Sequence, residues 1–82
     1  MILLIDIGNT HTHLGLGDEL GVLQTSAIDT HGLTIAQQTD ALKQLCDTKP
    51  TAAVVCSVVP DKTSAIQVSL RQAFDLFAAE LN

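Results

Sequence analysis

The chain opens with Ile2-Leu3-Leu4-Ile5-Asp6-Ile7-Gly8-Asn9-Thr10, in which an aliphatic run leads to a carboxylate, a glycine and two small hydrogen-bonding side chains. The aliphatic run predicts a strand that is buried on both faces. Asp6 comes near the end of this strand, where an unpartnered charge would be costly. Gly8 permits a tight turn and the close approach of a ligand. Asn9 and Thr10 add an amide and a hydroxyl beside exposed backbone N–H groups, so the segment predicts a site for phosphate and its magnesium ion.

The composition limits both the size of the core and the kind of partner. With 82 residues, the chain is one small domain or part of one, and a domain of this size leaves much of its surface in contact with water. Hydrophobic residues make up 46% of the chain, but Phe74 and Phe77 are its only Phe, Tyr or Trp residues, so the core must be aliphatic. The formal net charge of −5 argues against nucleic acid and against anionic membrane surfaces as partners.

The cysteines and the N-terminal segment indicate a cytoplasmic setting. Cys46 and Cys56 form no C-x-x-C pair and are too few for a disulfide framework, so we expect two small buried thiols in a reducing compartment. The apolar run at the N-terminus has no basic segment before it and is interrupted at Asp6, which argues against a signal peptide. No stretch approaches the roughly 20 apolar residues of a membrane span.

The first half of the chain predicts three strands and a helix. The strands are expected over residues 2–7, 11–17 and 20–28, close enough in sequence to pair as an antiparallel meander. A helix follows, with apolar residues spaced by three and four and with Gln37 and Gln38 on its polar face. The candidates for its N-terminal cap are Asp29, Thr30 and Thr34.

The second half predicts one more strand and one more helix, which makes this an α/β protein with a mixed sheet. A strand over residues 52–59 lies across a helical crossover from the earlier strands, so we expect it to be parallel to one of them. Pro60 ends this strand and begins the final helix, a position that its fixed φ suits. The expected order is strand-strand-strand-helix-strand-helix. The apolar stripe of the final helix is Ile66, Leu70, Phe74 and Phe77.

Two other groups of residues have a functional and a structural interpretation. His11 and His13 would share one face of a strand, and such a pair can bind zinc. A third ligand is not evident nearby, so the preferred interpretation is two strand histidines at a domain edge. Ser57 and Pro60 are interpreted as structural residues rather than ligand contacts.

Two motifs, in this order of elements, carry a resemblance to a known family. The segment from Asp6 to Thr10, together with Thr12, resembles the D-x-G-N-T motif of type III pantothenate kinases. Cys56-Ser57-Val58-Val59-Pro60 resembles the S-V-V-P ending of a later strand in the same family. That family belongs to the group that includes acetate and sugar kinases, heat-shock ATPases and actin. The resemblance implies that residues 1–82 are the N-terminal part of an actin-like ATPase domain, a truncated form of its ribonuclease H-like half.

The resemblance also implies a function. It implies a cytoplasmic kinase, a homodimer at full length, that moves the γ-phosphate of ATP to pantothenate in the first step toward coenzyme A. The implied cofactors are ATP, Mg²⁺ and a monovalent cation such as K⁺. Asp6 would hold the metal and the phosphate, and the nucleotide would be bound by Gly8, Asn9, Thr10 and Thr12. Phosphoryl transfer depends mainly on positioning and charge neutralisation, which agrees with these residue types.

The chain also departs from the family pattern. Family members are longer, with a second lobe of the same fold, and their presumed catalytic base is an Asp in a G-x-D-R motif that the 82 residues lack. Gln24-Thr25 and Gln37-Gln38 stand where the family often has Trp-Arg and an acidic pair. We therefore expect an N-terminal piece of such a kinase, truncated or divergent, with no catalytic residue of its own.

Two alternatives to the kinase interpretation stay open. The first is a non-catalytic phosphate- or nucleotide-binding module, or a gene fragment, of the same fold. The second is a sugar or acetate kinase, which is the weaker alternative because Asn9 follows Gly8 where those enzymes usually have a second glycine or a basic residue.

The sequence further predicts an uncovered sheet edge. In the related fold another strand follows the last helix and pairs beside residues 52–59. Without that strand, this uncharged and β-branched segment would be an open edge, which favours association between copies of the chain.

Overall fold

The computed structural model describes residues 1–81, which form five strands and two helices. The six elements expected from the sequence are present close to the predicted ranges, and a short fifth strand follows them. In chain order the elements are β1 (Ile2–Ile7), β2 (His11–Asp18), β3 (Gly21–Asp29), α1 (Ile35–Leu45), β4 (Ala52–Ser57), α2 (Pro60–Phe74) and β5 (Ala79–Leu81).

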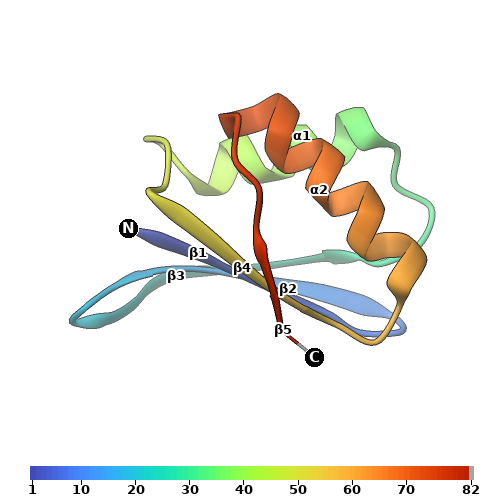
Figure 1. Ribbon diagram of the computed structural model, residues 1–82, viewed down its shortest axis with the longest axis horizontal. Coiled ribbons are helices and arrows are strands. Elements are labelled where there is room, and N and C mark those ends of the chain that lie inside the picture. The colour runs from blue at the N-terminus through green and yellow to red at the C-terminus, as the bar shows by residue number, and fades with distance from the viewer. Residues whose placement is uncertain (82) are drawn as a thin grey trace.

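The strands form one mixed sheet in the order β3-β2-β1-β4-β5. β2 is antiparallel to both β1 and β3, as expected for a meander, whereas β4 is parallel to β1 and β5 is parallel to β4. Both helices lie on the same side of this sheet, so the molecule has two layers (Figure 1). Within residues 1–81, no helix is long and apolar enough to cross a membrane.

Strand β1 is buried on one face, not on both as its sequence predicts. Leu3, Ile5 and Ile7 point into the core beneath the helices. The residues between them on β1 are exposed on the opposite face. The prediction was wrong because an uninterrupted aliphatic run carries no alternation that could identify the covered face.

The hydrophobic core lies between the sheet and the helices, and it is largely aliphatic as expected. It draws on β1, β2, β4 and both helices. Its completely or almost completely buried large side chains include Leu3, Ile7, Leu14, Leu42, Val55, Ile66 and Leu70.

Helix α1 starts at a capping box and packs against α2 through buried polar side chains. Thr34 is the N-cap: its hydroxyl accepts from the Gln37 backbone N–H at 3.1 Å, and the Gln37 side chain accepts from the Thr34 N–H at 2.8 Å. Gln38, expected on the polar face, is buried instead, because the Ser69 hydroxyl of α2 donates to its Oε1 at 2.9 Å. A polar residue can therefore occupy the helix interface when a hydrogen-bond partner faces it.

Helix α2 begins at Pro60, as predicted, but it ends earlier than the predicted apolar stripe. Its last residue is Phe74, and Asp75 follows in the left-handed conformation with φ 54°. That turn takes Phe77 out of the helix and leaves it 74% exposed. The prediction that Phe77 belongs to the buried stripe was wrong because the spacing alone does not show where the helix ends.

Strand β5 lies beside β4 and corrects the expectation of an open β4 edge. Val54, Val55 and Cys56 of β4 pair with Ala79–Leu81. The buried Gln67 side chain of α2 holds the chain just before β5: its Nε2 donates to the Ala78 carbonyl at 2.9 Å, and its Oε1 accepts from the Ala78 N–H at 2.8 Å. Three residues are too few to show strand periodicity in a sequence, which is why β5 was missed.

Candidate functional site

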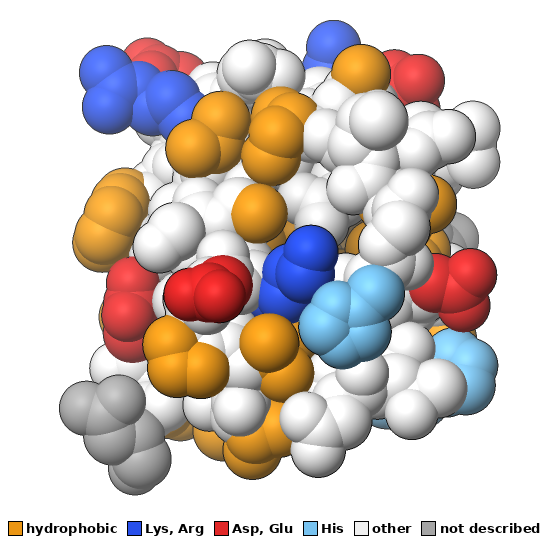
Figure 2. Space-filling model, turned by 90° about the vertical axis from the view of Figure 1, so that its right-hand side faces the viewer, with side chains coloured by type: hydrophobic (Ala, Val, Ile, Leu, Met, Phe, Trp, Pro, Cys, Tyr) orange, Lys and Arg blue, Asp and Glu red, His pale blue; other side chains and the backbone are white. Residues whose placement is uncertain are grey.

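The carboxyl ends of β1 and β4 lie at the same edge of the sheet because these two strands are parallel neighbours. The two motifs singled out in the sequence therefore meet. The N–H of Val58, after β4, donates to the carbonyl of Ile7, the last residue of β1, at 3.1 Å. In α/β sheets, this edge is where ligands bind. Figure 2 shows this end of the molecule, where acidic, basic and histidine side chains are interspersed among hydrophobic and uncharged ones.

The loop between β1 and β2 is a tight turn closed by its own backbone. The Gly8 N–H donates to the His11 carbonyl at 3.0 Å. A Cβ at position 8 would lie 3.1 Å from that carbonyl oxygen, so a side chain there would crowd the turn. Asn9 and Thr10 are exposed at its tip. The loop thus presents an amide and a hydroxyl to solvent on a short, constrained backbone.

A residue that the sequence did not single out for the site, Thr30, supports this loop from the covered side of the sheet. Its hydroxyl donates to the Gly8 carbonyl at 2.7 Å, and its N–H donates to the Thr10 carbonyl at 3.0 Å. The sequence proposed Thr30 only as a helix cap. Its contact with the loop spans 22 positions, and no local pattern shows a contact of that kind.

Thr12 does not lie with the other predicted site residues. Its side chain is buried on the face that the helices cover, whereas Asp6 is exposed on the opposite face. The Thr12 and Thr30 hydroxyl oxygens are 3.0 Å apart. Since the Thr30 proton is already donated to Gly8, Thr12 is the donor in this pair. The hydroxyl of Thr12 therefore braces the loop rather than facing a ligand.

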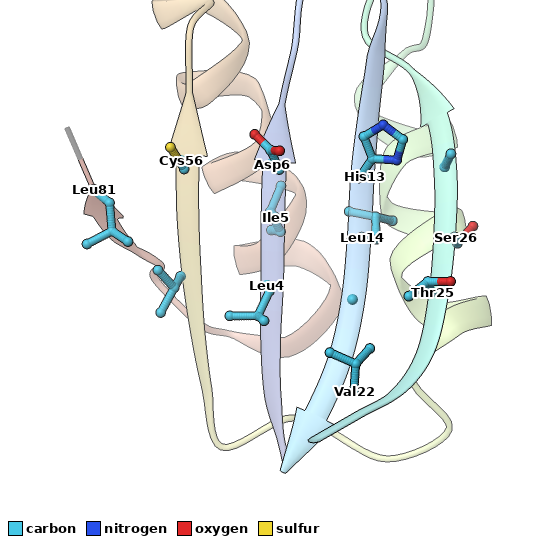
Figure 3. Close-up of a pocket in the computed structure, with 13 residues that line it drawn as sticks. Leu4, Ile5, Asp6, His13, Leu14, Val22, Thr25, Ser26, Cys56 and Leu81 are labelled. Carbon is cyan, nitrogen blue, oxygen red and sulfur yellow. The ribbon is translucent and has the colours of Figure 1, made fainter. Parts of the chain in front are cut away.

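Asp6 stands in a row of three polar side chains across neighbouring strands. In the sheet register, Asp6 of β1 lies between His13 of β2 and Cys56 of β4. Figure 3 shows the three side chains on the same open face, toward the carboxyl ends of β1 and β4. All three are exposed. The carboxylate is thus accessible to a cation or a phosphate-bound metal approaching from this side.

Below this row, the open face of the sheet forms a broad hollow of about 730 Å³. Its floor is mainly aliphatic and includes Leu4, Val22 and Leu81 (Figure 3). Val54 of β4 also lines it. The hollow joins Asp6 to an apolar surface, so the polar edge and the apolar floor are parts of one continuous face.

The two histidines on β2 share a face, as predicted. The ring centroids of His11 and His13 are 6.5 Å apart. Among residues 1–81, no group of three or more His, Cys, Asp or Glu side chains is arranged to hold a metal ion. A metal at Asp6 would therefore need further ligands from water or from a bound phosphate.

The two cysteines differ, and the expectation that both are buried was wrong. Cys46, at the end of α1, is buried, and both burial and the nearby Asp47 carboxylate raise the pKa of its thiol above the usual value of 9.0. Cys56 is exposed because its side chain lies on the open face of β4. A strand residue's burial depends on which face is covered, and the sequence does not show that.

A constrained glycine loop at the carboxyl end of a central strand, beside an accessible carboxylate, is an arrangement typical of α/β proteins that bind phosphorylated ligands. The family model for type III pantothenate kinase matches residues 2–81. The chain therefore belongs to the type III pantothenate kinase family. A search of curated proteins gave no match.

Proposed function

We propose that this chain is the ATP phosphate-binding part of a kinase that transfers the γ-phosphate of ATP to pantothenate. The observation that carries the proposal is the junction of the two motifs. The Asp6–Thr10 segment and the Cys56–Pro60 segment lie at one sheet edge, joined by the hydrogen bond from Val58 to Ile7. Membership of the family implies that the substrate is pantothenate and that the phosphate donor is ATP.

The fold supports the proposal at a finer level. An antiparallel meander followed by two parallel strands, in the order β3-β2-β1-β4-β5, supports the assignment of this sheet to the ribonuclease H-like half of an actin-like ATPase. The monovalent cation, the homodimer and the cytoplasmic location belong to the same proposal for the whole kinase.

The residues at the sheet edge fit a magnesium-bound phosphate. Asp6 offers exposed carboxylate oxygens, which are ligands that Mg²⁺ prefers. Bound Mg²⁺ would supply neutralisation of the phosphate charge. Asn9 and Thr10 would donate hydrogen bonds to phosphate oxygens, and Gly8 would let the backbone approach them. Thr12, with its hydroxyl directed to Thr30, would act on the ligand only through the loop.

Isothermal titration calorimetry of the chain with Mg-ATP tests the phosphate-binding role. Asp6→Asn keeps the side-chain shape but removes its charge, so we expect the affinity to fall by about tenfold or more. The matched control is Asp40→Asn, since Asp40 is an exposed carboxylate on α1 in the helix layer; it should leave the affinity unchanged. Equal affinities for the wild type and Asp6→Asn would remove Asp6 from the site.

A coupled assay for pantothenate-dependent ATP turnover tests the chain's own activity. The 82 residues contain no G-x-D-R segment, and general-base and positioning effects supply much of an enzyme's rate. We expect no turnover above background from these residues alone. Turnover that Asp6→Ala abolishes would show that the chain carries its own catalytic base.

A further inference from the structure

We propose that Thr30 is a positioning residue for the phosphate-binding loop, which it holds so that the backbone N–H of Asn9 points toward the ligand. The inference rests on the proposed function, because it concerns the same loop. It assigns a role to a residue outside both motifs, at the point where β3 has just ended.

Thr30 contacts the loop at both ends through its own two donors. Its hydroxyl donates to the Gly8 carbonyl at 2.7 Å, and its N–H donates to the Thr10 carbonyl at 3.0 Å. The side chain is 2% exposed, so water does not compete for these bonds. The Thr12 hydroxyl, 3.0 Å away, fixes the Thr30 hydroxyl in turn.

The geometry of the peptide unit connects the hydrogen bond between Thr30 and Gly8 to the ligand. The carbonyl of Gly8 and the N–H of Asn9 belong to one peptide group, and the peptide bonds of the described residues are all trans. In a trans peptide, the carbonyl and the N–H point in opposite directions. Because Thr30 draws the Gly8 carbonyl into the protein, the Asn9 N–H is directed outward at the tip of the loop.

An outward N–H is useful to the proposed site only if it is fixed before the ligand arrives. Donors that are already oriented stabilise an anion without the cost of ordering them during binding. The loop residues Asn9 and Thr10 are exposed and have little packing of their own. The hydrogen bonds from Thr30 beneath them thus set the direction of the Asn9 N–H.

The test compares Thr30→Val with Thr30→Ser in the full chain. Valine keeps the shape but removes the hydroxyl, whereas serine keeps it. The matched control is Thr39→Val, because Thr39 is also buried and its hydroxyl also donates to a backbone carbonyl, that of Ile35 at 2.8 Å, but within α1. The readouts are amide hydrogen exchange at Gly8, measured relative to the core amide of Val55, and the affinity for Mg-ATP.

We expect Thr30→Val to speed exchange at Gly8 about tenfold relative to Val55 and to weaken Mg-ATP binding about tenfold. Thr30→Ser should restore both values to near those of the wild type. Thr39→Val should leave the ratio of exchange rates and the affinity unchanged. If Thr30→Val left both readouts at wild-type values, or if Thr30→Ser behaved like Thr30→Val, the proposal would be overturned.

The two readouts also separate this proposal from the one on which it rests. A wild-type chain that does not bind Mg-ATP would count against the phosphate-binding function. The exchange comparison would then still decide whether Thr30 holds the loop. Exchange that rises equally at Gly8 and Val55 in Thr30→Val would show a general loss of stability and would overturn the positioning role.

Discussion

On the helix-covered face of the sheet, Leu3 is 0% exposed, whereas its neighbour Leu4 on β1 is 43% exposed on the open face. The same contrast holds for polar residues, since Thr12 on the covered face is buried with Thr30 as its partner and Asp6 on the open face is exposed. On β1, both faces carry large aliphatic side chains, but only one face is covered by the helices. The difference shows what the helix layer does. Side chains beneath it are buried and stabilise the core, whereas side chains on the open face stay accessible to ligands.

The largest expected difference between the faces comes from the two adjacent leucines. Leu3→Ala should destabilise the fold by about 2–5 kcal/mol, because it leaves a cavity in the core. Leu4→Ala should cost less than about 1 kcal/mol, because it removes a side chain that is already half in water. Urea unfolding, monitored by circular dichroism, measures the free energy of unfolding of both variants. Equal losses of stability in the two variants would mean that the open face is covered in solution.

The second comparison concerns buried and exposed hydroxyls. Ser69→Ala should cost about 1–3 kcal/mol, because it leaves Gln38 Oε1 buried without the donor it now has. Thr25→Val, on the exposed strand β3, should change the stability by no more than about 0.5 kcal/mol. The same unfolding experiment applies. The double variant Gln38→Leu/Ser69→Ala should recover part of the loss, and its failure to do so would show that the Ser69 hydroxyl has another role.

The two cysteines report the same contrast through their reactivity. At neutral pH, Cys56 on the open face should react with a thiol reagent at least about tenfold faster than Cys46, which needs a local opening of the fold. Mass spectrometry of each single-cysteine variant, Cys46→Ala and Cys56→Ala, gives the two rates. Similar rates would mean that the end of α1 opens freely.

The raised pKa of Cys46 also gives a pH dependence with a definite sign. The folded state holds the thiol proton more tightly than the unfolded state, whose pKa is near the ordinary 9.0. This contribution to stability is therefore fully present below pH 9.0 and is lost as the pH rises through the higher folded pKa. Thermal unfolding of the wild type and Cys46→Ala between neutral and alkaline pH measures it. A wild type that loses no more stability than Cys46→Ala would contradict the prediction.

The smallest expected effect is on association. An exposed apolar face favours contact between molecules, although the net charge of −5 opposes it. Because β5 covers part of β4, we expect copies of the chain to associate through the open face of the sheet rather than through a bare β4 edge. Sedimentation at rising concentration should show weaker association for the double variant Leu4→Ser/Val22→Ser. Leu20→Ser, at an exposed turn residue, is the control and should change nothing.

The sequence predicted the local features of the fold well. The bounds of β1 and the start of α2 at Pro60 were correct, because an aliphatic run and a proline act over a few residues. The antiparallel meander and the parallel fourth strand also followed from the lengths of the connections. Asp6 lies near the end of β1 as expected, and Gly8, Asn9 and Thr10 form the turn that follows it.

What the sequence did not predict depends on contacts between distant segments. Nothing near Gln38 shows that Ser69 will face it, and nothing near Gly8 shows that Thr30 will hold it. The burial of Thr12 and the exposure of Cys56 follow from the position of the helix layer, which is a property of the whole fold. The loop after β1 could be found from its motif, but its support could be found only from the structure.

The central position of β1 has a consequence for how the chain folds. β2 pairs with β1 through a short hairpin, and β3 pairs with β2 through another. β4, by contrast, must close a loop in which Thr51 bonds to Met1, 50 positions away. Closing a long loop costs more entropy than closing a hairpin, and contacts between distant residues slow folding. We therefore expect the meander to acquire protection in pulsed hydrogen exchange before β4 and β5 do. A nascent chain emerging from the ribosome would then expose the bare edge of β1 until residues 52–57 had also emerged, and this is the interval in which it would most need a chaperone.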